Sequence, residues 1–139
     1  MFAAACFSLI LLTACILIHY EVLRTLNDRL PGASWLPTRM RVVAALFGAM
    51  ASHFGQIAIF AFAYYILRDK FGMGQFGGQF DDIYSSFLYF SAETYTTLGL
   101  GDIYPMGPLR LVLGTETLTG LLMISWTASF TYLEMRRYW

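Results

Sequence analysis

The segment Thr94-Tyr95-Thr96-Thr97-Leu98-Gly99-Leu100-Gly101-Asp102 is short, polar and glycine-rich, and it lies between two apolar stretches. The apolar and aromatic residues 83–96 would form only ~21 Å of helix, which is too short to cross a bilayer. Ile103-Tyr104-Pro105 and a long apolar run follow. This order predicts a reentrant loop, in which a short helix enters the membrane and an extended segment returns.

All nine positions fit the signature of the potassium-channel pore family, T-x-T-T-V-G-Y-G-D, with Leu98 in place of Val and Leu100 in place of Tyr. The chain resembles this family from about Val42 to Met135. The resemblance implies a selectivity filter whose backbone carbonyls replace the water shell of a cation. It implies K⁺ sites at the carbonyls of Thr97, Leu98, Gly99 and Leu100, with the Thr97 hydroxyl as the innermost ligand.

The two glycines explain why this segment suits such a filter. Gly99 and Gly101 permit the left-handed dihedrals that turn consecutive carbonyls the same way. Non-helical backbone at membrane depth is tolerated only where it is buried in protein or lines a water-filled path. One chain carries one loop and a ring of carbonyls needs four, so a homotetramer with cyclic symmetry is implied.

Composition places the chain in the membrane class, because 58% of its 139 residues are hydrophobic and only 13% are charged. We expect an all-α membrane protein with three transmembrane helices, a reentrant pore helix and a selectivity filter. Three parts are predicted: a peripheral transmembrane helix (1–25), a cytoplasmic connector (26–41) and a pore domain (42–139). The pore domain divides into an outer helix (42–67), an extracellular loop (68–81), a pore helix (82–96), the filter (97–102) and an inner helix (107–135).

Polar residues mark two expected element ends. His19-Tyr20-Glu21 is interpreted as the polar boundary of the first transmembrane helix. Asp81-Asp82 is expected to start the pore helix, because acids favour a helix N-terminus through capping and the macrodipole.

Basic residues predict the orientation. Six of them fall on one side of the expected helices and three on the other, which favours the first side as cytoplasmic. The chain is therefore expected to be a multi-pass protein of the cell (inner) membrane, with its N-terminus outside and its C-terminus in the cytoplasm. The pore loop then enters from outside, as loops do in the family.

Residues next to the filter are expected to support it, and the candidates are Tyr89, Phe90, Glu93, Thr94, Thr96 and Asp102. Glu93 matches an acidic position that some bacterial pores carry nine residues before the filter aspartate. Two carboxylates in contact share a proton because both cannot ionise cheaply. We therefore expect Glu93 and Asp102 to form such a pair behind the filter, the alternative being that Asp102 is a solvated charge at the mouth.

Leu100 departs from the family pattern, since the usual tyrosine hydroxyl is missing. Tyr89-Phe90 stands where bacterial pores often have two tryptophans that brace this hydroxyl. We expect Leu100 to pack against Tyr89, Phe90 or a neighbouring subunit. Some tandem-pore potassium channels also carry Leu or Phe here, so both potassium selectivity and a more pliable filter that passes sodium are compatible.

In the inner helix, Gly120 lies close to the family's hinge glycine, and either a bend or close packing explains it. Leu121, Ile124 and Ala128 would face the cavity, where an apolar lining gates by dewetting. Glu116 and His53 are intramembrane ionisable groups and hence functional candidates. We expect them to form a polar pair, with Glu116 hydrogen-bonded between helices rather than touching ions.

The predicted function is a passive potassium-selective cation channel; the alternatives are a weakly selective potassium/sodium channel and a non-conducting membrane subunit that regulates another channel. The expected partners are potassium ions, the lipid bilayer and further copies of the chain. We expect no nucleic-acid partner, because there is no basic arm or stripe, and no cofactor apart from permeant K⁺. No nucleophile–base pair, metal-ligand cluster or phosphate-binding motif points to an enzyme.

Overall fold

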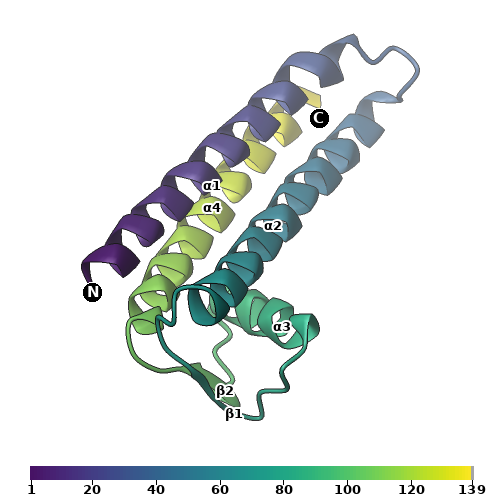
Figure 1. Cartoon of the computed structure of the whole chain (residues 1–139). Coiled ribbons are helices and arrows are strands. Elements are labelled where there is room, and N and C mark those ends of the chain that lie inside the picture. The colour runs from purple at the N-terminus through teal and green to yellow at the C-terminus, as the bar shows by residue number, and fades with distance from the viewer. Residues whose placement is uncertain (139) are drawn as a thin grey trace.

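The computed structural model describes residues 1–138, and the last residue of the predicted pore domain, Trp139, lies outside them. Within these residues, three long helices form a bundle, and a short helix with two strands sits at one end of it (Figure 1). The elements are α1 (Phe2–Arg29), the 3-10 turn η1 (Leu30–Gly32), α2 (Thr38–Asp69), β1 (Phe76–Gly78), α3 (Tyr84–Tyr95), β2 (Ile103–Pro105) and α4 (Leu109–Tyr138).

The three long helices of residues 1–138 have the length and composition of membrane spans. At 28, 32 and 30 residues they are about 42 to 48 Å long, more than the ~30 Å of a hydrocarbon core. Large apolar side chains such as Phe47, Phe54 and Phe62 are exposed on the outside of the bundle. Such a surface suits lipid or another subunit better than water.

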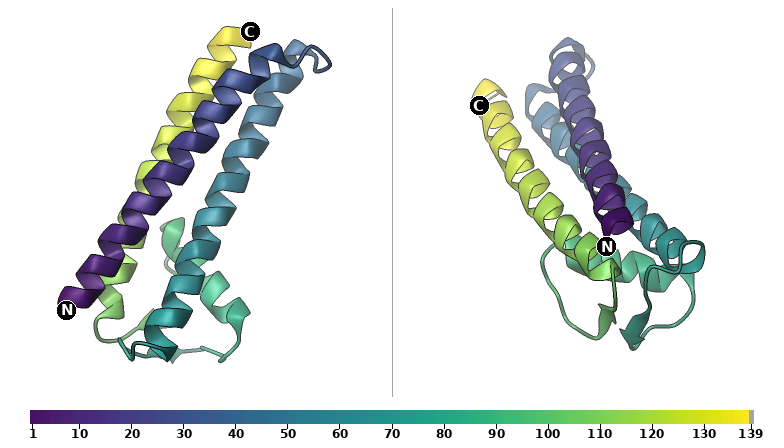
Figure 2. Two further views of the ribbon diagram at one scale, coloured as in Figure 1. Left: turned by 45° about the horizontal axis from the view of Figure 1, so that its top comes forward. Right: turned by 60° about the vertical axis from the view of Figure 1, so that its left-hand side comes forward.

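α1 packs against both α2 and α4, and the two views of Figure 2 show it lying along the other two helices over most of their length. Its N-terminus is at the end of the bundle that carries α3 and the strands, and the C-terminus of α4 is at the opposite end (Figure 1). The peripheral helix is therefore attached to the rest of the chain along its length and not only through the connector.

The apolar core lies where α2, α3 and α4 meet. Tyr64, Phe87, Phe90 and Val112 are buried there. The ring of Phe76 meets those of Tyr64 and Phe90 edge to face, at centroid distances of 5.7 and 5.0 Å. Aromatic pairs in this geometry add stabilisation beyond their buried area. This core holds α3 against the long helices and so positions the segment that follows α3.

The expected extracellular loop contains a strand that was not predicted. β1 pairs with β2 in antiparallel register, with Phe76 opposite Pro105 and Gly78 opposite Ile103. Gly78 has φ 87°, and a Cβ there would overlap the carbonyl oxygen of Asp102. The small sheet thus ties the loop before α3 to the residues directly after the filter segment (97–102).

Helix bounds differ from the predicted ranges at several ends. α2 begins at Thr38, four residues before the expected outer helix, and α1 continues to Arg29 inside the expected connector. The expectation that Asp81-Asp82 starts the pore helix is wrong, because α3 begins at Tyr84 with no acid in its first turn. Asp82 instead accepts a 2.5 Å hydrogen bond from Arg68 at the end of α2.

Candidate ion-conduction site

The filter segment follows α3 without any regular secondary structure. Thr96 keeps helical dihedrals, and the chain then turns at Thr97, Gly99 and Gly101, which have φ of 62°, 56° and 79°. These values lie in the left-handed region that glycine adopts readily. The predicted left-handed glycines are therefore present, and Thr97 joins them.

Thr97 is the unexpected member, because a β-branched residue rarely adopts a positive φ. Such strain persists only where the surroundings impose it, and it clusters at functional sites. Here the Thr97 amide donates to the carbonyl of Thr94 at 3.1 Å, and the Leu98 amide donates to the carbonyl of Glu93 at 2.9 Å. The end of α3 thus holds the start of the filter segment in this turn.

In the filter segment, most backbone amides are hydrogen-bonded, whereas consecutive backbone carbonyls are not. The amides of Thr97, Leu98, Gly99 and Leu100 all donate to residues 93 and 94, and the last of them reaches the Glu93 carboxylate at 3.2 Å. Within residues 1–138, the carbonyl oxygens of residues 97–101 accept no hydrogen bond. Consecutive carbonyls are therefore left unpaired, and an unpaired polar group inside a membrane costs several kcal/mol. Dehydrated cations are one partner that satisfies such carbonyls.

Asp102 is held by its own neighbours. Its carboxylate accepts hydrogen bonds from the Tyr89 hydroxyl and the Ile103 amide, both at 3.0 Å. The bond to Asp102 raises the pKa of Tyr89. Tyr89 is therefore bonded to the last residue of the filter segment, and its role in supporting a filter stays a prediction.

Glu93 is buried behind the filter segment with 4% of its surface exposed. Burial raises the pKa of its carboxyl, the Leu100 amide opposes this rise, and the negative charge of Asp102 adds to it. The structure places no hydrogen bond between Glu93 and Asp102 within residues 1–138. The two carboxylates interact through charge, and each has a separate hydrogen-bond donor.

A family model described as Ion channel matches residues 52–135. The chain belongs to this ion channel family. Searches of curated proteins and of solved structures find no match. The matched range starts within α2 and runs through α3, the filter segment and most of α4, so α1 lies outside it.

This channel is therefore a multi-pass membrane protein, and the polar side chains on its long helices are intramembrane groups.

Phe90 is not behind the filter segment as expected. It is 1% exposed and packs with Tyr64 and Phe76 in the core, because it lies on the face of α3 directed at α2. Thr94 is buried, and the Thr96 hydroxyl donates to the Ala92 carbonyl of its own helix at 2.8 Å.

Gly120 meets the end of the pore helix α3 closely. A Cβ at this position would overlap the carbonyl oxygen of Tyr95, and α4 continues through Gly120 without a break. Close packing thus accounts for this glycine, and a hinge stays a prediction. Leu121 and Ile124 are 55% and 41% exposed, and Ala128 is exposed on the same helix, so these predicted cavity residues are free of contacts that would bury them.

The expected pair of Glu116 and His53 does not form. Glu116 accepts hydrogen bonds from the hydroxyls of Tyr64 and Ser91, at 2.6 and 2.5 Å. His53 lies eleven residues before Tyr64 on α2, which is about 16 Å along the helix. Glu116 is hydrogen-bonded between helices as expected, but its partners come from the level of Tyr64.

His53 contacts a different set of groups. Its Nδ1 lies 2.9 Å from the Tyr95 hydroxyl, and its Nε2 lies 2.9 Å from Oγ1 of Thr127. His19 joins the same cluster, with Nε2 at 3.1 Å from Thr127 Oγ1. The interpretation of His19 as a polar boundary is wrong, because this side chain is fully buried among α2 and α4. In the sequence, the one indication that His19 is buried was its position in a long apolar helix.

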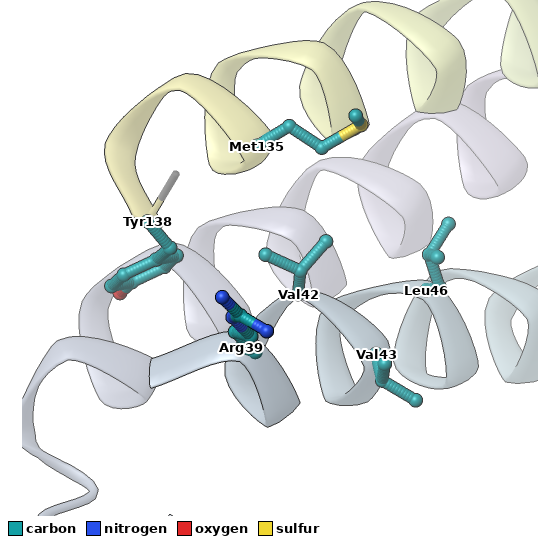
Figure 3. Close-up of a pocket in the computed structure, with 6 residues that line it drawn as sticks. All are labelled: Arg39, Val42, Val43, Leu46, Met135 and Tyr138. Carbon is teal, nitrogen blue, oxygen red and sulfur yellow. The ribbon is translucent and has the colours of Figure 1, made fainter. Parts of the chain in front are cut away.

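An open groove runs between α2 and α4. Near the filter it has a volume of about 580 Å³, and its lining includes Ile57, Thr96 and Ile124. Toward the other end it continues as a hollow of about 750 Å³, shown in Figure 3 with its lining residues Arg39, Val42, Val43, Leu46, Met135 and Tyr138. Leu46 and Met135 line both parts, so the two hollows are neighbours along the same pair of helices.

Proposed function

We propose that four copies of this chain form a potassium-selective cation channel around a central ring of filter segments. The observation that carries the proposal is the row of carbonyls at residues 97–101, which accept no hydrogen bond within residues 1–138, whereas the amides of residues 97–100 do donate. A chain that pairs the amides and leaves the carbonyls free offers oxygen ligands in sequence to a permeant cation.

Potassium would bind at the carbonyls of Thr97, Leu98, Gly99 and Leu100, with the Thr97 hydroxyl as the innermost ligand. Hard cations prefer oxygen ligands, and K⁺ channels use carbonyl oxygens in place of the hydration shell. The C-terminal end of α3 precedes the filter segment, so the partial negative charge of its helix dipole favours a cation nearby. The pore helix and the carbonyl row therefore favour the same ligand charge.

A tetramer is supported by what one chain leaves uncovered. Leu98 and Leu100 are 64% and 61% exposed, although they lie in the most specific stretch of the sequence. The apolar groove between α2 and α4 is also open along its length. Closed cyclic symmetry covers both surfaces in every subunit with one repeated interface.

The proposed orientation places the filter outside. The N-terminus of α1 lies at the filter end of the bundle, and the arginine-rich ends of α1, α2 and α4 gather at the other end (Figure 1). Basic residues favour the cytoplasmic side, so the N-terminus is proposed to lie outside and the C-terminus inside, in the cell (inner) membrane.

A weakly selective potassium/sodium channel is the second candidate, and Leu100 is the observation that favours it. An apolar side chain cannot make the hydroxyl bonds that brace the filter of the resembled family. Tyr89, which stands where such a brace would be received, donates to Asp102 instead. In this alternative the row of carbonyls is the same, but the filter is less rigid than the braced filter of the resembled family.

Purified protein in liposomes under opposed potassium and sodium gradients tests the proposal. A reversal potential near the potassium limit is expected, and an intermediate value would favour the weakly selective channel. Absence of flux from protein that is tetrameric by mass measurement in detergent would contradict conduction and favour a non-conducting subunit. Liposomes without protein give the leak that must be subtracted.

A further inference from the structure

Five buried side chains from all four helices form a closed ring of hydrogen bonds behind the end of the pore helix. They are His19 of α1, His53 and Gln56 of α2, Tyr95 of α3 and Thr127 of α4. Four of them are less than 9% exposed, and Thr127 is partly buried. The contacts around the ring measure 3.1 Å (Gln56–His19), 3.1 Å (His19–Thr127), 2.9 Å (Thr127–His53), 2.9 Å (His53–Tyr95) and 2.8 Å (Tyr95–Gln56).

The proton positions in this ring agree with one another. The Tyr95 hydroxyl donates to Oε1 of Gln56, so it accepts from Nδ1–H of His53. Nε2 of His53 is then an acceptor, which the hydroxyl of Thr127 supplies with a proton.

The ring closes through α1. Because Thr127 donates to His53, it accepts from Nε2–H of His19. Nδ1 of His19 is then an acceptor for the Gln56 amide, which completes the circuit. The buried Ser52 hydroxyl lies beside this link, 3.2 Å from Nδ1 of His19, and it accepts from the Gln56 amide at 3.1 Å. Each of the five members donates once and accepts once within the ring when both imidazoles are neutral.

Tyr95 connects this ring to ion conduction. It is the last residue of α3, and Thr97 of the filter segment is two residues further. Its hydroxyl is held by the ring, while its backbone carbonyl packs on Gly120 of α4. The residue from which the filter segment departs is therefore fixed at both its side chain and its backbone.

α1 enters the ring through His19 alone, and this helix lies outside the range that matches the Ion channel family. The indole of Trp126 covers the imidazole at a centroid distance of 5.5 Å. A helix held only by apolar packing has no need of a fully buried imidazole, whose polar atoms are costly to desolvate unless they are paired. The polar contact with α4 and α2 thus indicates a role beyond anchoring.

We propose that the ring is a positioning device for the filter, through which α1 sets the orientation of Tyr95 and so the fraction of time that the channel is open. This inference rests on the proposed function as a channel. The ring residues act on the filter segment through Tyr95, the last residue of α3, and none of them touches the ion. Removing the hydroxyl of Thr127 or of Tyr95 opens the circuit, whereas His19 and Gln56 stay linked to each other through Ser52.

The test uses variants of the full chain, measured as single channels in planar bilayers. Thr127→Val and Tyr95→Phe each remove one hydroxyl, and His19→Ala removes the α1 member. Each variant is expected to change the open probability about fivefold, the factor that the loss of one net hydrogen bond brings. The double variant of Thr127 and Tyr95 is expected to match the single ones, because the ring is already cut.

Matched controls separate positioning from stability. Thr127→Ser keeps the hydroxyl and should restore wild-type gating. Thr117→Val removes a hydroxyl that bonds only to Leu113 of its own helix, and Tyr65→Phe is a tyrosine change outside the ring. Neither control should alter the open probability.

Two results would overturn the inference separately from the channel proposal. If the wild type conducts and assembled ring variants keep its open probability, or differ only in thermal stability, the ring does not position the filter and the channel proposal stands. If additive effects appear in the double variant, the closed circuit is wrong. If the tetrameric wild type carries no current, both proposals fail.

Discussion

The pore helix and the filter segment are adjacent in the chain, yet they differ in burial and in hydrogen bonding. Ser91 and Tyr95 are 0% and 1% exposed, whereas Leu98 and Leu100 are 64% and 61% exposed. The hydroxyls of Ser91 and Tyr95 in the pore helix find partners on α2 and α4, while the carbonyls of residues 97–101 accept no hydrogen bond within residues 1–138. The chain thus completes the support by itself, and the proposed tetramer would complete the conducting surface.

This difference predicts that the two regions respond differently to substitution. Buried groups contribute to folding, since losing a paired polar group or overfilling a core costs a large part of a marginal stability. Exposed groups of the filter segment contribute little to the folding of one chain. Changes that overfill the support should therefore destabilise the protein, whereas changes in the filter segment should reduce conduction without destabilising the fold of one chain.

The largest effect is expected from Gly120→Ala. The new methyl group would overlap the Tyr95 carbonyl, and overpacking of this kind costs about 1–3 kcal/mol. We expect a lower melting temperature and loss of tetramer in detergent, measured by circular dichroism and gel filtration. Gly55→Ala is the control, because a Cβ there meets no atom within 4 Å. Equal stability of the two variants would contradict the close contact between α4 and α3.

The next effect concerns function without folding. Gly101 has φ 79° and open space around it, so Gly101→Ala strains the backbone of the filter segment but clashes with nothing in the chain. We expect more than tenfold less potassium flux from liposomes, with a melting temperature close to that of the wild type. Wild-type flux from this variant would show that the left-handed turn is not needed for conduction.

A smaller effect is expected when the family residue is restored at the exposed position. Leu100→Tyr supplies the missing hydroxyl and should raise the permeability ratio of potassium over sodium several-fold, because a braced filter discriminates ion size better. The measurement is the reversal potential under mixed gradients. Leu98→Val, which also restores a family residue but adds no hydroxyl, should leave the ratio unchanged. A ratio that falls in Leu100→Tyr would argue against hydroxyl bracing in this channel.

The smallest effect is a pH dependence at the boundary between the two regions. Burial raises the pKa of Glu93 above the ordinary value of 4.5, so the folded protein binds a proton more tightly than the unfolded chain. Stability should therefore fall as pH rises from about 4.5 through the folded-state pKa. Glu93→Gln, which cannot ionise, should have a flatter melting profile than the wild type between pH 4.5 and 7.

The exposed Glu21→Gln is the control for that profile. It lies on α1 outside the filter region and should keep the wild-type slope. If Glu93→Gln also keeps this slope, Glu93 titrates as a solvated carboxyl and is not part of the buried support.

The left-handed conformations of Gly99 and Gly101 could be predicted from sequence because the information for them is local. Gly99 and Gly101 indicate left-handed dihedrals because glycine adopts them readily. The lengths of the apolar runs on either side predict a reentrant loop. Thr97 was expected only as the first filter residue and an ion ligand, and its φ of 62° was not predicted because nothing in a β-branched residue indicates a positive φ. That conformation comes from the amides and carbonyls at the end of α3.

The support could be predicted only in part because its partners are distant in sequence. His19 contacts a threonine 108 residues away. From sequence alone, a histidine in an apolar helix can equally well be buried or mark the polar end of the helix. The register that separates His53 from Glu116 depends on how α2 and α4 pack, which residue spacing within one helix does not set. Phe76–Gly78 is too short a strand to carry a periodic signal.

The most direct measurement of the central claim is the anomalous scattering of Rb⁺ or Tl⁺ in crystals of the assembled protein. Either ion replaces potassium and marks its sites. We predict a row of peaks on a fourfold axis, each surrounded by carbonyl oxygens from Thr97 to Leu100 of four chains. An axis without ions between the filter segments, or filter carbonyls turned into hydrogen bonds with neighbouring subunits, would contradict the account.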